Sequence, residues 1–297
     1  MMVDLHVHTY MSDGQHSPED VVSMAWAKGV GLLAVTDHDA MDGLDEAEAA
    51  ARRLGVGFVP GIEISAGAVG DGKLHILGYY VDRLDAALLR LNAEFARQRE
   101  EREDMIYGRL RDKGIIISKE RLRRNVKGRI VSRTHFARVL VEDGHAADFA
   151  DAFDRYLSEP EMDRPKVSPE RGIALIREAG GVAVMAHPSS LKMSHADLDD
   201  LAGRLAGMGL MGMECHYCSY GREETGRYAA IAEKHGLAVT GGSDFHGERV
   251  KPRVEIGTGI DGLLSFTDEG IGETLEKLRG GVGGRSAPKK GFKPIEA

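Results

Sequence analysis

The chain has 297 residues, of which 42% are hydrophobic and 29% charged, and it carries a formal net charge of -8. This length and composition predict a globular fold with an ample buried core. The acidic balance argues against a general nucleic-acid coat protein, but an anionic substrate is still compatible because bound divalent cations reverse the local field. Two cysteines exclude a disulfide scaffold and suit a reducing cytosol, so we expect a cytoplasmic protein.

Neither a leader peptide nor a membrane span is expected. The N-terminus runs directly into Val3–His8 without a basic or apolar leader segment. No segment approaches the 18 uninterrupted apolar residues of a membrane-spanning helix. The sequence also indicates no protein partner.

Short apolar runs alternate with helical segments in the first part of the chain. Ser17, Pro18 and Gly29 mark the first helix as its N-cap, its first-turn residue and the glycine just past its end. The predicted strands are Val3–His8, Gly31–Thr36, Phe58–Ile64 and Leu74–Val81, and the predicted helices are Pro18–Lys28 and Leu44–Leu54.

The same alternation returns in the second half of the chain. The predicted helices there are Glu170–Ala179, Ala196–Met208 and Glu223–His235, and the predicted strands are Val182–Ala186, Met211–His216 and Leu237–Thr240. Repeated strand–helix units of this size predict a parallel sheet covered by helices, so the fold class is α/β.

A charged, helix-favouring stretch interrupts the alternation between Asp85 and about Lys166. We predict an inserted helical subdomain over 85–166, with the α/β domain formed by 1–84 and 167–279 and a flexible Gly- and Lys-rich tail at 280–297. Residues 85–133 hold 14 basic and 8 acidic side chains, whereas the remainder holds 25 and 39. This basic excess is either a solvated helical surface, as most charge runs are, or a substrate-binding face. The second interpretation is stronger between Arg121 and Arg133.

Histidines and carboxylates with the spacing of metal ligands begin at the N-terminus. His6 and His8 lie two residues apart on a predicted strand, so their side chains point to the same face and both can reach one ion. Asp13 can return to that pocket from the Ser12–Gly14 turn. The alternative interpretation is that His6 and His8 are ordinary surface histidines without a metal. Asp244 and His246 repeat the two-residue spacing in a glycine-rich turn that lets the backbone approach a ligand closely.

Further metal-competent residues stand where predicted strands end. Active sites of strand–helix barrels form at the carboxyl ends of the strands, and the residues at six such ends are His8, His38, Glu63, His187, His216 and Asp244. His75 instead opens a strand. His75 and His187, taken singly, could also be satisfied core histidines. Oxygen- and imidazole-rich clusters without thiolate are typical of Mn, Fe or Zn sites for hydrolysis.

These motifs resemble the PHP-domain family of metal-dependent phosphoesterases, named for polymerase and histidinol phosphatase. The segments that carry the resemblance appear in the family's order: HxHT at 6–9, SDG at 12–14, TDHD at 36–39, GIE at 61–63, AHP at 186–188 and GSDFHG at 242–247. The similarity covers residues 1 to about 260. In the insertion, 132–137 and 152–157 resemble the stand-alone branch of nucleoside 3′,5′-bisphosphate phosphatases and exonucleases that trim short RNA from its 5′ end.

The resemblance implies a distorted (β/α)7 barrel of PHP type that holds two or three divalent ions, with Mn first and Fe or Zn as alternatives. One ion would bind His6, His8, Glu63 and Asp244, a second Glu63, His75 and His187, and a third Asp13, His38 and His246. Arg133 and His135 of the insertion would bind substrate. His216 and Tyr220 would face the phosphate, although this stretch is variable in the branch, and Ala40 replaces the Thr that often follows TDHD.

The implied reaction is attack on phosphorus by a hydroxide held between two ions, because divalent metals lower the pKa of bound water from about 15.7 towards neutrality. Arg133 would neutralise the phosphoryl oxygens, and Asp244 or His246 would assist proton transfer, with the general acid left open between them. The expected activity is removal of the 3′-phosphate from nucleoside 3′,5′-bisphosphates, such as adenosine 3′,5′-bisphosphate to AMP, with short 5′-phosphorylated RNA as a further substrate. The alternatives are a histidinol-phosphate phosphatase-like monoesterase and a non-catalytic metal-binding regulatory module.

Overall fold

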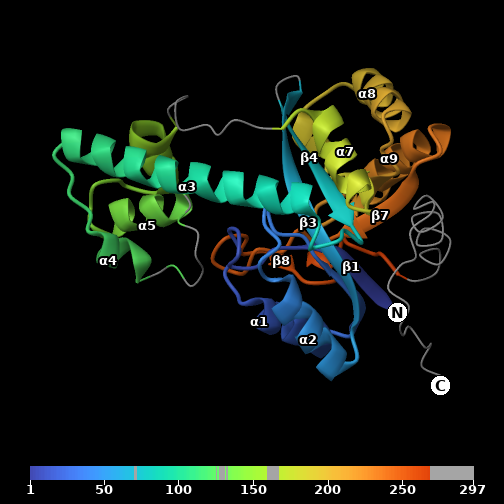
Figure 1. The fold of residues 1–297 in the computed structure, drawn as a ribbon, viewed down its shortest axis with the longest axis horizontal. Helices are drawn as coiled ribbons and strands as arrows, with labels where there is room; N and C mark the ends of the chain where they lie inside the picture. The colour runs from blue at the N-terminus through green and yellow to red at the C-terminus, as the bar shows by residue number, and fades with distance from the viewer. Residues whose placement is uncertain (70–71, 125, 127–130, 132, 159–166, 268–297) are drawn as a thin grey trace.

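A seven-stranded sheet forms the centre of the computed structural model, which describes residues 1–69, 72–124, 126, 131, 133–158 and 167–267. The strands lie in the sheet in chain order (Figure 1). They are β1 Met2–Val7, β2 Val30–Val35, β3 Gly57–Val69, β4 Gly72–Tyr79, β5 Val182–Met185, β6 Gly212–Tyr217 and β7 Ala238–Gly242.

The two edge strands nearly close the sheet into a barrel. The Asp244 amide, just past β7, donates to the His6 carbonyl at 2.7 Å, and the His8 amide donates to the Phe245 carbonyl at 2.9 Å. Phe245 also forms a parallel bridge with Val7. The predicted α/β fold class and barrel are therefore confirmed, and closure brings the first and last sequence motifs side by side.

The predicted parallel sheet has one exception, β4, which runs antiparallel to both β3 and β5. Only residues 70–71 separate β3 from β4, and so short a connection can join only antiparallel strands. The reversal places the beginning of β4 at the same end of the barrel as the carboxyl ends of the parallel strands. This explains how His75 reaches the other ligands although it opens its strand.

Helices cover the outside of the barrel, and each begins where the sequence predicts within one or two residues. They are α1 Pro18–Ala27, α2 Leu44–Leu54, α7 Pro169–Glu178, α8 His195–Gly207 and α9 Arg222–Lys234. Ser17, Ser168 and Ser194 cap α1, α7 and α8 by accepting backbone N–H groups of the first turn. Apolar side chains of these helices pack on the outward-facing side chains of the strands in one continuous core.

A second apolar cluster fills the inside of the barrel below the polar strand ends. Its members come from alternate strand positions and from the segment that follows β7: Val3, Leu5, Leu32, Ala34, Val59, Leu77, Tyr79, Val182, Val184, Ala186, Ala238, Leu264 and Phe266. Two short strands, β8 Val254–Glu255 and β9 Gly259–Ile260, pair in that last segment. The packed interior provides a water-excluding floor for the polar groups above it.

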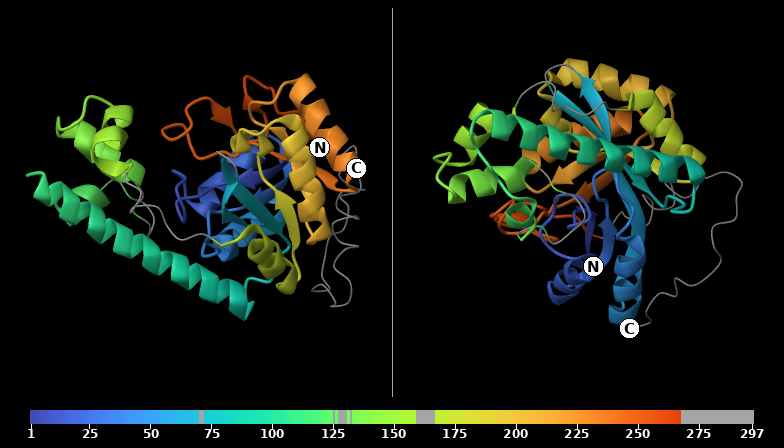
Figure 2. Two further views of the ribbon diagram at one scale, coloured as in Figure 1. Left: turned by 90° about the horizontal axis from the view of Figure 1, so that it is seen from above. Right: turned by 60° about the vertical axis from the view of Figure 1, so that its left-hand side comes forward.

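The described part of 85–158 is helical and projects from the barrel on one long helix (Figures 1 and 2). This helix, α3 Ala86–Asp112, is followed by α4 Lys119–Arg123, α5 Arg133–Glu142, α6 Phe149–Ala152 and the π-helical turn η1 Phe153–Leu157. An apolar cluster of their own, including Ile106, Leu122, Phe136 and Leu157, holds these helices together. Residues 159–166 and the predicted tail at 280–297 lie outside the described residues.

Candidate metal centre

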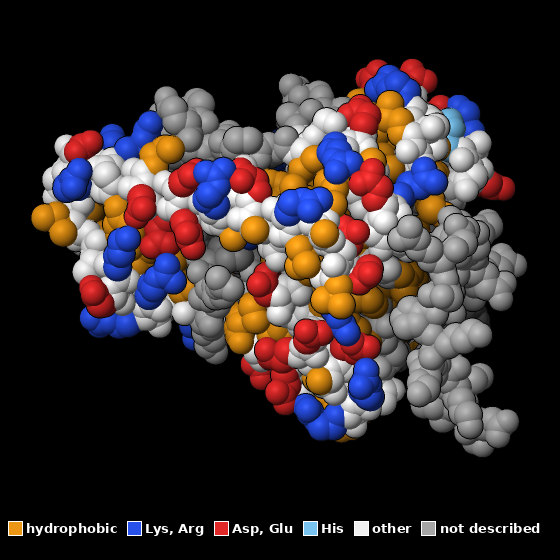
Figure 3. All heavy atoms as spheres, viewed as in Figure 1, with side chains coloured by type: hydrophobic (Ala, Val, Ile, Leu, Met, Phe, Trp, Pro, Cys, Tyr) orange, Lys and Arg blue, Asp and Glu red, His pale blue; other side chains and the backbone are white. Residues whose placement is uncertain are grey.

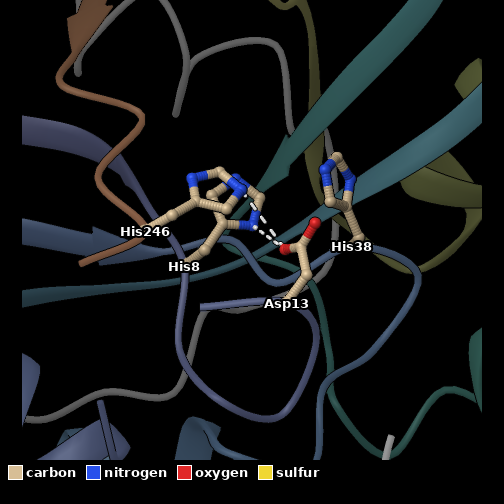
Figure 4. Close-up of side chains that lie close together, drawn as sticks. All are labelled: His8, Asp13, His38 and His246. Atoms are coloured by element: carbon tan, nitrogen blue, oxygen red, sulfur yellow. Dashed lines mark ion pairs between the residues drawn. The ribbon is translucent and has the colours of Figure 1, made fainter. Parts of the chain in front are cut away.

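The structure brings all nine predicted metal ligands together at the carboxyl-terminal mouth of the barrel. They form overlapping groups in which one donor atom from each residue lies within 4.8 Å of the others. The groups are His6, His8 and Glu63; His6, His187 and Asp244; His38, Glu63 and His75; and His8, Asp13, His38 and His246. Figure 4 shows the last group, in which side chains from the segments that follow β1, β2 and β7 converge.

Glu63 is the centre of the cluster and is completely buried. Its Oε1 lies 3.0 Å from His75 Nδ1 and 2.9 Å from His187 Nε2. Its Oε2 lies 3.2 Å from His8 Nε2 and 3.0 Å from His38 Nδ1. One carboxylate thus faces different histidines with its two oxygens, which is the arrangement that a bridging metal ligand requires.

Several donor atoms in this cluster are buried without a hydrogen-bond partner among the described residues. They are His8 Nδ1, His38 Nδ1 and Glu63 Oε2. His6 Nε2 and His8 Nε2 also face each other at 3.1 Å. Buried polar atoms are normally paired, and nitrogen lone pairs crowded around carboxylate oxygens repel one another unless a cation lies between them. The donor set therefore fits divalent metal ions.

The electrostatics of the cluster follow from the same crowding. Burial alone would raise the pKa of Glu63, but His38, His6 and His75 hold it well below its ordinary value. Burial lowers the pKa of His8 to about 4, and the neighbouring His246 and His38 act in the same direction. Glu63 is accordingly ionised and His8 is neutral at pH 7, as metal ligation needs. Against the effect of burial, the surrounding carboxylates raise the pKa of His6 well above its ordinary value and that of His38 to about 9, so these two imidazoles would release a proton when a metal ion binds.

Backbone and side-chain acceptors fix the ring orientation of three of the histidines. The Nδ1 atom of His6 lies 2.9 Å from Glu214 Oε1, that of His187 lies 3.0 Å from Ser190 Oγ, and that of His246 lies 2.9 Å from the Asp244 carbonyl. Because each Nδ1–H has an acceptor, each Nε2 keeps its lone pair for the cluster.

Glu214 is a supporting residue that the sequence analysis missed. Its Oε1 accepts from the His6 ring, and its Oε2 accepts from the backbone N–H of His187 at 2.7 Å. The side chain is completely buried in β6. A carboxylate within an otherwise buried strand segment, Gly212–Cys215, was the available signal, since such a group is retained only when it is hydrogen-bonded.

The non-ligand residues of the motifs hold the ligand loops in place. Asp37 accepts from the Thr9 amide, from Thr9 Oγ1 and from Ser12 Oγ, which fixes the loop that carries Asp13. Asp39 has a φ of 51° and accepts from the amide and hydroxyl of Ser65. This left-handed conformation is uncommon for residues other than glycine, and the two hydrogen bonds stabilise it.

Tyr217 and Lys251 orient Asp244. The Tyr217 hydroxyl donates to Asp244 Oδ2 at 2.6 Å, and Lys251 Nζ forms an ion pair with the same oxygen. The other oxygen, Oδ1, faces His6 and His8 at 3.5 and 3.2 Å. Burial alone would raise the pKa of Asp244, but Lys251 and His6 hold it well below its ordinary value.

The residues predicted to bind substrate occupy different surroundings. Burial and the neighbouring Arg138 lower the pKa of His135, in α5, to about 4, and the Asp13 carboxylate opposes them. Arg133, at the start of the same helix, donates to the Leu157 carbonyl at 3.1 Å and lies over the Phe153 ring. Arg99 of α3 is buried, donates to the His38 carbonyl and lies 3.6 Å from Asp39 Oδ2, so the projecting helix contacts a ligand loop directly.

His216 and Tyr220, which were predicted to face the phosphate, make other contacts in the structure. The His216 ring packs on Phe266, with ring centroids 5.1 Å apart, and it interacts with the Ser265 backbone. β6 therefore presents Tyr217 to the cluster instead, because an irregularity in its pairing with β7 follows Glu214. Tyr220 is 2% exposed and its hydroxyl is engaged by Ser189, so it packs behind Tyr217.

Imidazole and carboxylate donors gathered around one buried glutamate at the mouth of a barrel define the class, a hydrolase that works through divalent metal ions. The chain belongs to the PHP domain family, whose model matches residues 4–159. The protein is thus a metal-dependent phosphoesterase.

Three comparisons illustrate this membership. The 3′,5′-nucleoside bisphosphate phosphatase of Chromobacterium violaceum is 35% identical over 248 residues, which are 82% of this chain and 87% of that protein. The 5′-3′ exoribonuclease Rnm of Escherichia coli is 33% identical over 291 residues, 94% of this chain and 98% of that protein. A solved structure from Bifidobacterium adolescentis, classed as a metal-dependent phosphoesterase, superposes with a TM-score of 0.73 at 30% identity and covers 92% of this chain and 95% of its own. Among the described helices, none is both long and apolar enough to cross a membrane.

Proposed function

We propose that this protein removes the 3′-phosphate from nucleoside 3′,5′-bisphosphates, giving the 5′-monophosphate and inorganic phosphate. The observation that carries the proposal is the contact of the insertion with the metal cluster, where the buried Arg99 of α3 donates to the carbonyl of His38. A phosphoryl group at the cluster would therefore lie beneath groups of the insertion, and a nucleoside is a substrate large enough to contact both. The similarity to a bisphosphate phosphatase over 82% of the chain supports this substrate class.

The proposed cofactor is a set of two or three divalent ions, with Mn first and Fe or Zn as alternatives. His6, His8, Glu63 and Asp244 would hold one ion, Glu63, His75 and His187 a second, and Asp13, His38 and His246 a third. In addition, His8 lies close enough to share the third group and His187 lies close to His6 and Asp244. When bound, such ions lower the pKa of water and neutralise the charge of a phosphoryl group.

The side chains of this protein would position the substrate and move protons. Hydrolysis adds a water oxygen to phosphorus, breaks the bond between phosphorus and the 3′ oxygen, and leaves a proton on that oxygen. Asp244 is held ionised by Lys251 and His6, so of the two candidates it would accept a proton rather than donate one. Arg133 and His135 would bind the nucleotide from α5, since Arg is the natural clamp for a phosphate.

Short 5′-phosphorylated RNA is a second proposed substrate, because the Escherichia coli exoribonuclease aligns over 94% of this chain. A phosphodiester and a 3′-phosphomonoester present the same bond between phosphorus and the 3′ oxygen, so one site could cleave both.

A product analysis tests the proposal. The Mn-loaded protein is incubated with adenosine 3′,5′-bisphosphate, histidinol phosphate and a 5′-phosphorylated tetraribonucleotide, and the products are separated by chromatography. We expect AMP and phosphate from the bisphosphate at the highest kcat/KM. Release of adenosine 3′-phosphate, or faster turnover of histidinol phosphate, would contradict the proposal.

A further inference from the structure

A cavity of about 250 Å³ opens beside the metal cluster on the side of β4 and β5. It is lined by Gly72, Lys73, His75, His187, Ser190 and Lys192. Two of these residues are metal-ligand candidates and two are lysines, so the cavity joins the cluster to a positively charged wall. None of the roles derived above uses either lysine.

The two lysines come from different elements that meet at this cavity. Lys73 is in β4, next to Gly72, where an added Cβ would lie 2.2 Å from Leu191 Cα. Only glycine therefore allows β4 to approach the 3₁₀ helix Pro188–Leu191 so closely. Ser190 Oγ donates to the Lys73 carbonyl at 3.2 Å, and the same hydroxyl accepts from His187 Nδ1. The cavity wall is thus tied to a residue of the cluster.

Lys192 occupies an unusual backbone position. It ends the 3₁₀ helix with a φ of 53°, in the left-handed region where glycine or asparagine is the usual residue. A side chain held there at a conformational cost is a reason to look for a function. Its position next to His187, Ser190 and Lys73 suggests what that function is.

Charge also favours an anion in this cavity. Among the residues that the structure describes, no ion pair involves the ammonium group of Lys73 or of Lys192, whereas Lys28, Lys119, Lys234 and Lys251 each pair with a carboxylate. The cavity therefore offers two cations and no carboxylate in its lining.

We propose that Lys73 and Lys192 form an anion subsite that binds the phosphate of the substrate that is not hydrolysed. This inference rests on the proposed function, because it assigns the 5′-phosphate of a nucleoside 3′,5′-bisphosphate to the subsite while the 3′-phosphate lies at the metal cluster. Arg99 of the insertion contacts the His38 loop, whereas the lysines flank His75 and His187. The substrate would then be held from two sides, by its nucleoside and by its second phosphate.

The test compares a double variant, Lys73→Ala with Lys192→Ala, with the wild-type protein. We expect KM for adenosine 3′,5′-bisphosphate to rise about tenfold or more, since two partly solvated charge pairs together contribute on the order of 1.4 kcal/mol. We expect kcat for the bisphosphate, and both constants for p-nitrophenyl phosphate, to stay within twofold, because that substrate has no second phosphate. A separate readout is calorimetry of AMP binding to chelator-treated protein. The double variant should bind AMP more weakly by a similar factor, whereas its binding of adenosine should be unchanged.

A matched control removes the same charge elsewhere. Lys28 follows α1 and Lys234 ends α9, and both pair with acidic groups away from the cluster. The variant Lys28→Ala with Lys234→Ala should leave KM for the bisphosphate unchanged. An equal rise of KM in both double variants, or for both substrates in the subsite variant, would overturn the subsite. If the wild-type protein did not hydrolyse the bisphosphate at all, the proposed function would fail, and unchanged AMP binding would then separately reject the subsite.

Discussion

At the scale of single residues, the cluster depends on side chains that orient ligands as much as on the ligands themselves. Glu214 is the strongest example, because one buried carboxylate accepts from the His6 ring and from the His187 backbone. If the acceptor on His6 Nδ1 were lost, the ring could carry its proton on Nε2 and no longer offer a lone pair to a metal. Glu214 thus holds His6 and His187 in place, although it is not itself a metal-ligand candidate.

Glu214→Gln should therefore weaken metal binding by about 10- to 100-fold, the range typical of such supporting residues. The measurement is the Mn affinity of the metal-free protein, determined by competition with a chelating dye. Glu255→Gln is the matched control, because that carboxylate pairs with Lys28 on the surface. An unchanged affinity in Glu214→Gln would show that the hydrogen bond to His6 does not govern ligation.

The ligands were predictable from the sequence, whereas their supports were not. His6, His8 and Glu63 follow simple rules, since i and i+2 share a face of a strand and strand ends carry active sites. Glu214 and Lys251 act through contacts that depend on barrel closure and on the path of the chain after β7, neither of which a local pattern encodes. His216 illustrates the same limit, because an irregularity in β6 turns Tyr217, rather than His216, towards the cluster.

At the scale of elements, the long helix α3 links the insertion to a metal-ligand loop. Arg99 is 5% exposed, donates to the His38 carbonyl and lies near Asp39, which has a strained backbone. α3 therefore does more than carry the insertion away from the barrel. It also supports the loop that presents His38.

Arg99→Ala should lower the free energy of unfolding by about 2 kcal/mol, because it removes a buried hydrogen bond from a charged donor. It should also lower kcat/KM, since the His38 loop loses its support. Urea unfolding and steady-state kinetics measure the two effects. Arg97 is the control on the exposed side of α3, where it pairs with Glu94 and Glu101; Arg97→Ala should leave both quantities unchanged. Equal behaviour of the two variants would refute the coupling.

The helix α5 contributes a buried histidine whose stability effect depends on pH. The pKa of His135 is lowered to about 4 in the folded chain, whereas an unfolded histidine titrates near about 6.5. The unfolded state thus binds more protons between these values, so stability is lost as pH falls from above 6.5 towards 4. His135→Gln should therefore remove about 2 kcal/mol of the loss in unfolding free energy across this window. Parallel slopes for the variant and the wild-type protein, measured in urea with chelator present, would contradict the burial of a neutral imidazole.

The sequence predicted the order of the elements but not the direction of β4 in the sheet. Apolar runs predicted a strand at Leu74–Val81, but the periodicity of a strand is the same in either direction. The direction is set by the short connection at 70–71 and by the long excursion through α3, which replaces the usual crossover helix. The reversal decides that His75 belongs to the cluster.

At the scale of the whole molecule, the uneven charge of the chain has a local explanation. Figure 3 shows acidic and basic side chains interleaved along α3 and the insertion. Arg97 pairs with Glu94 and Glu101, and Arg121 pairs with Glu142 and Asp143. These two arginines therefore belong to surface ion pairs, and this favours the solvated-surface interpretation for the parts of the insertion that carry them.

The whole barrel mouth should respond to metal removal, because its ligands crowd one another. A ligand that binds only the folded state at 100 times its Kd stabilises it by about 2.7 kcal/mol. Saturating Mn should accordingly raise the melting temperature by several degrees relative to protein in chelator, and Glu63→Gln should reduce that rise. Differential scanning calorimetry measures both. A melting temperature independent of Mn would mean that the cluster does not bind the ion.

The central claim is that the nine clustered residues hold the metal ions that allow phosphoester hydrolysis. The most direct test titrates chelator-stripped protein with Mn while bound metal and phosphate release from adenosine 3′,5′-bisphosphate are measured on the same samples. We predict that phosphate release is absent without metal, rises with bound Mn and saturates at two to three ions per chain, and that Glu63→Gln abolishes it. Full activity in the stripped protein, or metal-saturated protein without phosphoesterase activity on any substrate tested, would contradict the claim.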